Sequence, residues 1–320
     1  MNISTFQSNL DFIKNLYFRE EWKDRNCRKE ILAALEEANT KIEKAFGESL
    51  HRLYDHKPSI KAVGKVVKKF PSTLSYADEN GQIPIQWAAA DDGFEYVPIL
   101  AKEGIKHEVG GEDARGGLLM IDPSSDEEVN SLQWLVYAAD EDEDRLRVLK
   151  ELQKSGLLVK KDIQEQNLMF SSFCEGNQMR FEYLADWDPN ALIETRIRDK
   201  PLIHHIIASQ SEEAAIILAL KNGFKYHPST GGLLFVENDN GTTAFDCLCN
   251  KIGEEKAMSL LHEILTPDCK YPILHHVFIK APQEKDIFME KFPPSIKHYH
   301  IKTTVSIAKH TALLFNIQSS

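Results

Sequence analysis

The chain repeats one pattern in two stretches, Asp78-Glu79-Asn80-Gly81-Gln82-Ile83-Pro84-Ile85-Gln86 and Asp239-Asn240-Gly241-Thr242-Thr243-Ala244-Phe245-Asp246. In each stretch a polar turn with a glycine leads directly into an apolar segment. Glycine adopts the left-handed backbone that tight turns need, and the apolar segment is typical of a helix start. Arg198-Asp199-Lys200-Pro201-Leu202-Ile203-His204 is similar, although it lacks the glycine. A turn followed by a helix, found three times, predicts a repeat architecture.

Seven pairs of residues mark the expected first helix of each repeat. Their spacings run from 29 to 47 residues, which brackets the lengths of helical repeats. The two longest spacings contain the insertions Gly116–Leu119 and Gly231–Leu234, whose leucines we expect to pack against neighbouring helices. The pairs are Leu50-His51, Ile85-Gln86, Leu132-Gln133, Phe170-Ser171, Ile203-His204, Phe245-Asp246 and Leu274-His275.

Two kinds of signal predict where helices end. Proline follows an apolar helical segment at Pro71, Pro189 and Pro293, and proline cannot donate the next backbone hydrogen bond. Glycine followed by an apolar residue ends other segments, where a left-handed glycine closes a helix. These glycines are Gly104, Gly156 and Gly223.

These stretches resemble ankyrin repeats in a divergent form. The resemblance implies an all-α, ankyrin-like helical-repeat solenoid of about seven helix pairs over residues 48–296. It also implies that a histidine in each of several repeats ties that repeat to the next by hydrogen bonds, a role that falls to His51, His204 and His275. Residues 1–47 are expected to form a helical cap, because an end repeat exposes an apolar flank. Residues 297–320 are expected to form a second, basic cap or a tail that docks on an acidic partner.

Composition excludes several classes of protein. The 320 residues are 42% hydrophobic and 27% charged, which suits a folded chain, and the net charge of −11 disfavours binding to nucleic acid. The longest apolar run, Ala214 to Leu220, is far shorter than the ~20 residues that span a bilayer. Without a secretion signal at the start, the five cysteines predict a reduced protein of the cytoplasm, with the nucleus as the alternative.

No motif in the sequence predicts catalysis. The loop Gly111–Leu118 has the glycine spacing of a phosphate-binding loop but lacks the lysine and the hydroxyl that would hold phosphate and magnesium. His107-Glu108 and His262-Glu263 lack the second histidine of a zinc protease. Cys247-Leu248-Cys249 is interpreted as part of a helix that buries its cysteines, and His298-Tyr299-His300 lacks further ligands. The sequence therefore predicts a non-enzymatic protein without a cofactor or metal.

Two acidic clusters, Asp126-Glu127-Glu128 and Asp140–Asp144, are expected to begin helices. Acids favour the positive end of the helix dipole. Each cluster is either a solvated helix start or an acidic patch that attracts a basic partner, and the sequence leaves both readings open.

The sequence thus predicts a scaffold or adaptor, monomeric alone, that binds a protein partner on the concave face and loop tips of the array. The expected contacts precede the first helices of three repeats. Two alternatives remain, namely a substrate adaptor of a larger complex such as a ubiquitin ligase, and an enzyme with a scattered active site. The expected contact residues are Asp78, Glu79, Asn80, Arg196, Arg198, Asp199, Glu237, Asp239 and Asn240.

Overall fold

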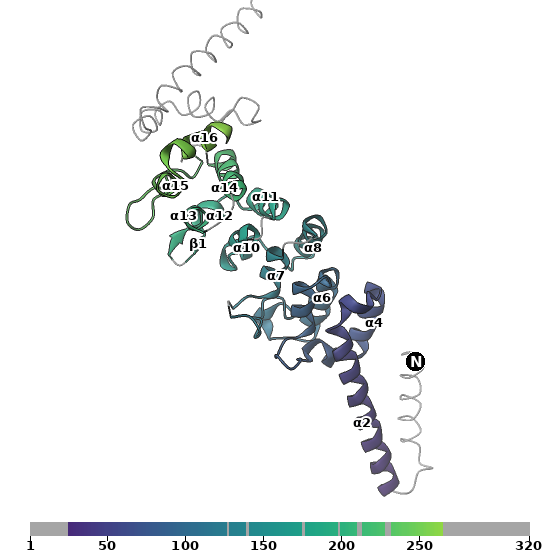
Figure 1. Cartoon of the computed structure of the whole chain (residues 1–320). Helices are drawn as coiled ribbons and strands as arrows, with labels where there is room; N and C mark the ends of the chain where they lie inside the picture. The colour runs from purple at the N-terminus through teal and green to yellow at the C-terminus, as the bar shows by residue number, and fades with distance from the viewer. Residues whose placement is uncertain are drawn as a thin grey trace, which may run out of the picture. The chain divides into compact units, whose positions relative to one another are not determined.

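The structure is a computed structural model, and it describes residues 25–126, 128–138, 141–174, 177–197, 199–209, 213–227 and 232–264. These ranges are mostly helical, and the one sheet within them has two short strands (Figure 1). The all-α fold class predicted from the sequence is therefore confirmed. The chain divides into two compact units between Ala191 and Leu192.

The first compact unit runs from the long helix α2 (Arg25–Leu50) to α11 (Gln178–Trp187). Short 3-10 turns connect some of its helices: η1 (Pro71–Ser75), η2 (Phe94–Tyr96) and η3 (Glu112–Ala114). The remaining helices are α3 (Leu53–His56), α4 (Ile60–Lys69), α5 (Pro84–Ala90), α6 (Val97–Lys106), α7 (Ser131–Tyr137), α8 (Asp142–Lys154), α9 (Asp162–Glu165) and α10 (Leu168–Cys174).

These helices pack in two layers. In one layer α5 contacts α7 and α7 contacts α10, while in the other α4, α6, α8 and α11 follow one another. Contacts between α5 and α6, α7 and α8, and α10 and α11 join the layers, and Figure 1 shows the last two pairs. Leu100, Leu135, Leu149 and Phe181 come from both layers and are fully buried. The core of this compact unit therefore lies between the two layers.

The second compact unit has the same kind of packing. After α12 (Ala191–Glu194), strand β1 (Arg196–Ile197) pairs antiparallel with β2 (Lys200–Pro201). Helix α13 contacts α15, helix α14 contacts α16, and contacts of α13 with α14 and of α15 with α16 join the two pairs. These helices are α13 (Leu202–Ala208), α14 (Glu213–Tyr226), α15 (Ala244–Ile252) and α16 (Glu254–Ile264).

Four of the predicted helix starts are confirmed in register. Ile85-Gln86, Leu132-Gln133, Ile203-His204 and Phe245-Asp246 are the second and third residues of α5, α7, α13 and α15. Gln86 and Gln133 each accept a hydrogen bond of 2.8 Å from the backbone N–H three residues earlier. Asp246 does the same at 3.1 Å. The third position therefore satisfies a backbone donor that the helix itself leaves free.

Two other predicted starts differ from the structure. Phe170 is the third residue of α10, so the start lies one residue earlier than predicted. Leu50 is the last residue of α2 rather than the beginning of a helix, so the start at Leu50-His51 is wrong. Helix α2 also continues past the predicted cap boundary at residue 47. Its end is held there because Phe46 stacks on Phe70 with ring centroids 5.1 Å apart.

Three side chains, one after the end of α2 and two at the third position of a helix, form hydrogen bonds to the backbone about one repeat further along the chain. His51 Nε2 lies 3.0 Å from the carbonyl oxygen of Gln82, and His204 Nε2 lies 2.7 Å from that of Val236. Gln86 Nε2 donates in the same way to Ile121, at 2.9 Å. The long-range hydrogen bonds predicted for His51 and His204 are thus present, and a glutamine makes the corresponding bond from α5.

The predicted helix ends are partly confirmed. Helix α4 stops one residue before Phe70-Pro71, and α11 stops one residue before Asp188-Pro189. Helix α8 ends with Gly156 in the left-handed conformation, at a φ of 74°. The N–H of Leu157 then bonds to the carbonyl of Leu152 at 2.9 Å, as a Schellman end requires.

The helix ends predicted at Gly104 and Gly223 are wrong. Helix α6 continues through Gly104 to Lys106, and α14 continues through Gly223 to Tyr226. A Cβ on Gly104 would lie 2.4 Å from the carbonyl oxygen of Gly116, and one on Gly223 would lie 2.6 Å from that of Gly232. These glycines are needed because the insertion loops approach the helices closely, and not because the helices end there.

The insertion loops bury their leucines, as predicted. Leu118, Leu233 and Leu234 are buried, and Leu119 is half-buried. The backbone of Gly116 or Gly232 touches the helix, and the adjacent leucines enter the core. Each insertion is therefore part of its compact unit's core rather than an exposed flap.

Of the two acidic clusters, one begins a helix as predicted. Asp142, Glu143 and Asp144 form the first turn of α8. The start predicted at Asp126 is wrong, since α7 begins at Ser131 with Asn130 as its cap. The Asn130 side chain accepts a hydrogen bond of 3.0 Å from Gln133 N–H, so the amide takes the capping role that we assigned to the acid.

Several predictions fall on residues that the structure does not describe. These are the first helix of the N-terminal cap, the units at Leu274-His275 and Phe292-Pro293, and the basic segment 297–320. Across the described ranges, no helix combines the length and the apolar character required to cross a membrane.

Candidate partner-binding site

The turn at residues 78–82 holds the first group of predicted contacts. Asp78 Oδ1 accepts hydrogen bonds of 2.9 Å from the N–H groups of Asn80 and Gln82. Gly81 closes the turn with a φ of 83°, and its N–H bonds to the Asp78 carbonyl at 3.1 Å. A side chain that bonds its own loop in this way fixes the loop without help from a neighbour. Glu79 and Asn80 therefore project from a rigid turn.

The turn at residues 238–242 has the same hydrogen bonds in the second compact unit. Asn238 Oδ1 accepts from Asn240 N–H at 3.0 Å and from Thr242 N–H at 3.1 Å. Gly241 has a φ of 71°, close to that of Gly81. An amide thus replaces the Asp78 carboxylate with no change of the turn, so the turn geometry depends on an oxygen acceptor and not on charge.

The Asp78 carboxylate also makes a hydrogen bond outside its own turn. Its second oxygen accepts a 3.0 Å hydrogen bond from the indole N–H of Trp87. Burial by itself would raise the pKa of Asp78. The hydrogen bonds from Gln82, Trp87 and Asn80, together with the nearby His51, outweigh burial and lower that pKa below 3.8. The carboxylate therefore stays charged and holds both the turn and the indole.

The hairpin of β1 and β2 positions the remaining contacts. Arg196 donates from Nε and Nη2 to the carbonyl oxygen of Asp199, at 3.1 and 2.7 Å, and it also forms an ion pair with Asp239. Asp199 has a φ of 65°, which the two-residue turn of the hairpin requires. The hairpin and the turn at 238–242 are thus tied together by one arginine.

The predicted contact residues form one group in each compact unit. Asp78, Glu79 and Asn80 belong to the first, and the others belong to the second. Asp78 is half-buried, and the other predicted contacts in the described ranges are exposed. Arg198 lies outside the described residues. The exposed contacts are Glu79, Asn80, Arg196, Asp199, Glu237, Asp239 and Asn240.

An open pocket of about 710 Å³ adjoins the turn at 78–82. Its walls come from the end of α2, from α3, from the segment after η1 and from α5. Three ring side chains line it, namely His51, Tyr76 and Trp87. Five carboxylates line it as well: Glu48, Asp55, Asp78, Glu79 and Asp91. Of these five carboxylates, only Asp78 and Glu79 were predicted from the sequence. The others join them because α2 packs against η1 and η1 packs against α5.

The cations of the pocket are fewer than its carboxylates. Among the described side chains that line it, Lys44 and Arg52 are the permanently positive ones. Lys44 lies 3.8 Å from Glu48 and so offsets one carboxylate. Burial and repulsion from Asp92 raise the pKa of Asp91, Arg145 lowers it, and Asp55 raises it further. The charges of Asp92 and Asp55 therefore disfavour the charged form of the Asp91 carboxylate.

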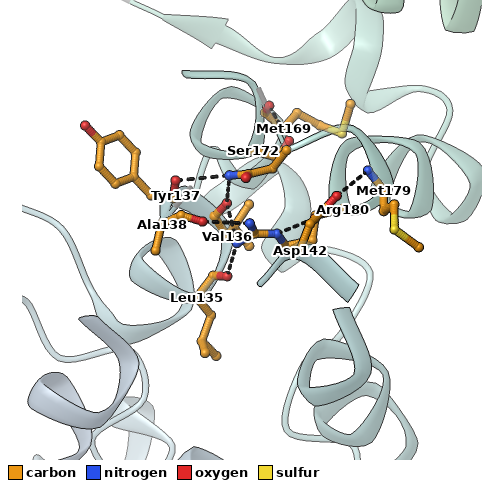
Figure 2. A network of polar contacts seen from close by, with 10 residues as sticks. Leu135, Val136, Tyr137, Ala138, Asp142, Met169, Ser172, Met179 and Arg180 are labelled. Atoms are coloured by element: carbon orange, nitrogen blue, oxygen red, sulfur yellow. Dashed lines mark hydrogen bonds and ion pairs between the residues drawn. The ribbon is translucent and has the colours of Figure 1, made fainter. Parts of the chain in front are cut away.

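A second polar cluster in the first compact unit is structural, and Figure 2 shows it. Arg180 has no exposed surface, and its Nε bonds to Asp142 at 2.7 Å. Its other nitrogens donate to the carbonyl oxygens of Leu135, Val136 and Ala138 at 2.6 to 3.1 Å. These carbonyls end helix α7 and lack partners within it. Arg180 thus caps α7 from a fully buried position.

Arg145 performs the same task for α5. It is buried, donates to the carbonyl oxygens of Ala89 at 2.9 Å and Asp91 at 3.3 Å, and lies 4.6 Å from the ring centroid of Phe94. Neither arginine was predicted as a structural residue from the sequence. Their separation of 35 residues matches a repeat spacing, and this is the signal that could have revealed them.

The glycine-rich loop that lacks a phosphate-binding lysine also has a structural role. Its Arg115 makes paired hydrogen bonds of 2.5 and 2.9 Å to the buried carboxylate of Asp162. Asp162 in turn accepts a 2.8 Å bond from Val159 N–H. The guanidinium of this loop is therefore engaged by a neighbouring carboxylate.

A cysteine and a histidine do meet in the second compact unit. Cys247 Sγ lies 3.4 Å from His204 Nδ1, while His204 Nε2 bonds to the Val236 carbonyl. The pair comes from helices α13 and α15, and both cysteines of α15 are half-buried rather than buried as predicted. Burial and the Asp246 carboxylate raise the pKa of Cys247, and Lys200 opposes them more weakly. A nucleophilic cysteine needs a lowered pKa, so this contact does not favour catalysis.

Within the described ranges, no three His, Cys, Asp or Glu side chains are grouped closely enough to hold a metal ion. Comparison of the chain with protein-family models, with curated proteins and with solved structures found no match.

Proposed function

We propose that the chain is a non-catalytic, ankyrin-like repeat protein that binds a basic protein partner through its loop tips. Three features support the repeat assignment: the identical turns at 78–82 and 238–242, the long-range bonds of His51, Gln86 and His204, and the paired capping arginines. Each feature recurs at intervals close to one or more repeats.

The observation that carries the binding proposal is the construction of the tips. Their backbones are fixed by internal hydrogen bonds. The side chains of Glu79, Glu237 and Asp239 are exposed, and Asp239 also pairs with Arg196. A rigid loop loses little conformational entropy on binding, so its exposed side chains contribute more fully to affinity. Acidic tips on a chain with a net charge of −11 favour a basic partner.

The test is purification of the tagged full chain from its own cells, followed by mass spectrometry. One variant carries Glu79→Lys and Glu237→Lys together with the exchange Arg196→Asp and Asp239→Arg. The exchange reverses the charges at positions 196 and 239 but keeps an ion pair between the hairpin and the turn at 238–242. We expect a consistent partner of the unaltered chain to be lost.

The matched control carries Glu112→Lys and Glu151→Lys, which change the net charge by the same amount at exposed positions away from the tips. It should retain the partner. A partner retained by the tip variant, or lost equally from both variants, would contradict the proposal.

A further inference from the structure

The pocket beside the turn at 78–82 combines two chemical features that each favour a cation. Its ring walls are close together, with the centroid of His51 5.8 Å from that of Tyr76 and 6.4 Å from that of Trp87. All three side chains are half-buried, so part of each remains open to the pocket. The negative face of an aromatic ring attracts a cation within about 6 Å.

Hydrogen bonds at the ring edges hold these walls in place. Trp87 donates to Asp78, and His51 Nε2 bonds to the Gln82 carbonyl. The backbone at Gly47 lies against the Tyr76 ring, since a Cβ there would be 2.4 Å from Cγ of Tyr76. The rings are therefore ordered before any ligand arrives, which reduces the entropy cost of binding.

Charge points to the same ligand. Beside the Lys44–Glu48 pair, the described lining of the pocket includes four carboxylates and one arginine. Asp55 and Asp91 come from α3 and from the residue after α5, and repulsion from Asp55 contributes to raising the pKa of Asp91. A cation placed between them would replace this repulsion with two attractions.

Size and ligand geometry select among cations. The described residues include no group of three side chains arranged to hold a metal ion, which disfavours a bare ion here. A volume of about 710 Å³ accommodates a long side chain with part of its backbone. A guanidinium or an ammonium on a flexible stem can reach the carboxylates while its stem or plane lies against the rings.

We propose that this pocket receives an arginine or lysine side chain from a basic segment of a protein partner. The inference rests on the proposed function, because it adds a binding pocket to the proposed partner contact at the turn 78–82. In this inference the basic side chain of the partner binds in the pocket, whose residues come both before and after the turn in the sequence.

The direct test uses the full chain labelled with ¹⁵N and follows the indole signal of Trp87, assigned with Trp87→Phe. The probe is N-acetyl-arginine amide, and the matched probe is N-acetyl-citrulline amide, which has nearly the same shape without the charge. We expect a saturable shift of the Trp87 signal with the arginine probe at millimolar concentrations and little shift with the citrulline probe. N-acetyl-lysine amide with a free ε-amine should resemble the arginine probe.

The variant pair is Asp55→Asn with Asp91→Asn, and its control is Glu112→Gln with Asp113→Asn, which removes the same charge from exposed positions outside the pocket. The pocket variant should bind the arginine probe at least tenfold more weakly, and the control should stay within about twofold. Raising NaCl from about 50 to 500 mM should weaken binding to the unaltered chain, which tests the charge without any substitution.

Equal shifts with the arginine and citrulline probes, or unchanged binding by the pocket variant, would overturn the inference. These outcomes are distinct from failure of the proposed function. If the tip variant loses its partner while the Trp87 indole signal does not shift with the arginine probe, the tips bind the partner and the pocket does not. If Trp87 responds but the tip variant keeps its partner, the pocket stands and the tips are excluded.

Discussion

At the scale of single residues, two buried arginines cap helices of the first compact unit. Arg180 joins one carboxylate to three carbonyls from another helix, and it does so without contact with solvent. Burial lowers the pKa of Arg180, and the adjacent Asp142 opposes that effect. Such a group stabilises the fold only while all its partners are present, because each partner would otherwise be buried without a donor.

We therefore expect Arg180→Met to destabilise the first compact unit by about 3 kcal/mol, because the carbonyls at the end of α7 lose their donors. Urea denaturation followed by circular dichroism measures this loss. Arg147→Met is the control, since Arg147 is exposed and pairs with Asp144 at 3.0 Å. Its effect should stay within about 0.5 kcal/mol. Equal effects of the two substitutions would contradict a capping role for Arg180.

Two aspartates near the pocket should respond to pH in opposite directions. The pKa of Asp78 is lowered in the fold, so its charge stabilises the fold above the ordinary pKa of 3.8 and this stabilisation is lost as the pH falls below it. The pKa of Asp91 is raised, so its contribution is present at low pH and is lost as the pH rises through that raised value.

Thermal melts between about pH 3 and 7 test this difference. Asp78→Asn should lower stability at pH 7 more than at pH 3, although asparagine keeps the turn, as Asn238 does. Asp91→Asn should raise stability at pH 7 relative to pH 3. The same sign of change in both variants would show that the two carboxylates do not differ in this way.

At the scale of elements, close contact between loops and helices decides where glycine is required. Gly104 lies inside α6, where alanine would normally be the better helix former. The carbonyl of Gly116 occupies the space that a Cβ would need. Packing of the insertion loop thus outweighs helix propensity at this position.

Gly104→Ala should therefore destabilise the fold by about 1–3 kcal/mol, because the loop must move away from the helix. The matched control is Gly64→Ala in α4, where a Cβ would meet Ile99 at an ordinary distance of 3.5 Å. That substitution should be neutral or stabilise by up to about 1 kcal/mol. Chemical denaturation of both variants compares them, and a stabilising Gly104→Ala would contradict the close packing.

At the scale of the whole molecule, charge sets how a partner approaches. In the proposed function, the net charge of −11 attracts basic segments over a range that salt shortens. We expect the full chain to bind a peptide of alternating arginine and glycine about tenfold more weakly when NaCl rises from about 50 to 500 mM. Fluorescence anisotropy of the labelled peptide measures this, with an alanine–glycine peptide as control. A binding affinity that does not change with the NaCl concentration would argue against electrostatic attraction.

The sequence by itself determined the helical class, the starts of α5, α7, α13 and α15, and the helix ends at Phe70-Pro71, Asp188-Pro189 and Gly156. These features depend on residues within one or two turns of one another, so local patterns contain them. Only the tertiary structure decided the roles of Gly104 and Gly223, the capping arginines and the pocket. Each of these depends on atoms that are distant in sequence, such as the Gly116 carbonyl or the Asp55 carboxylate, and no local pattern specifies which distant atoms will meet.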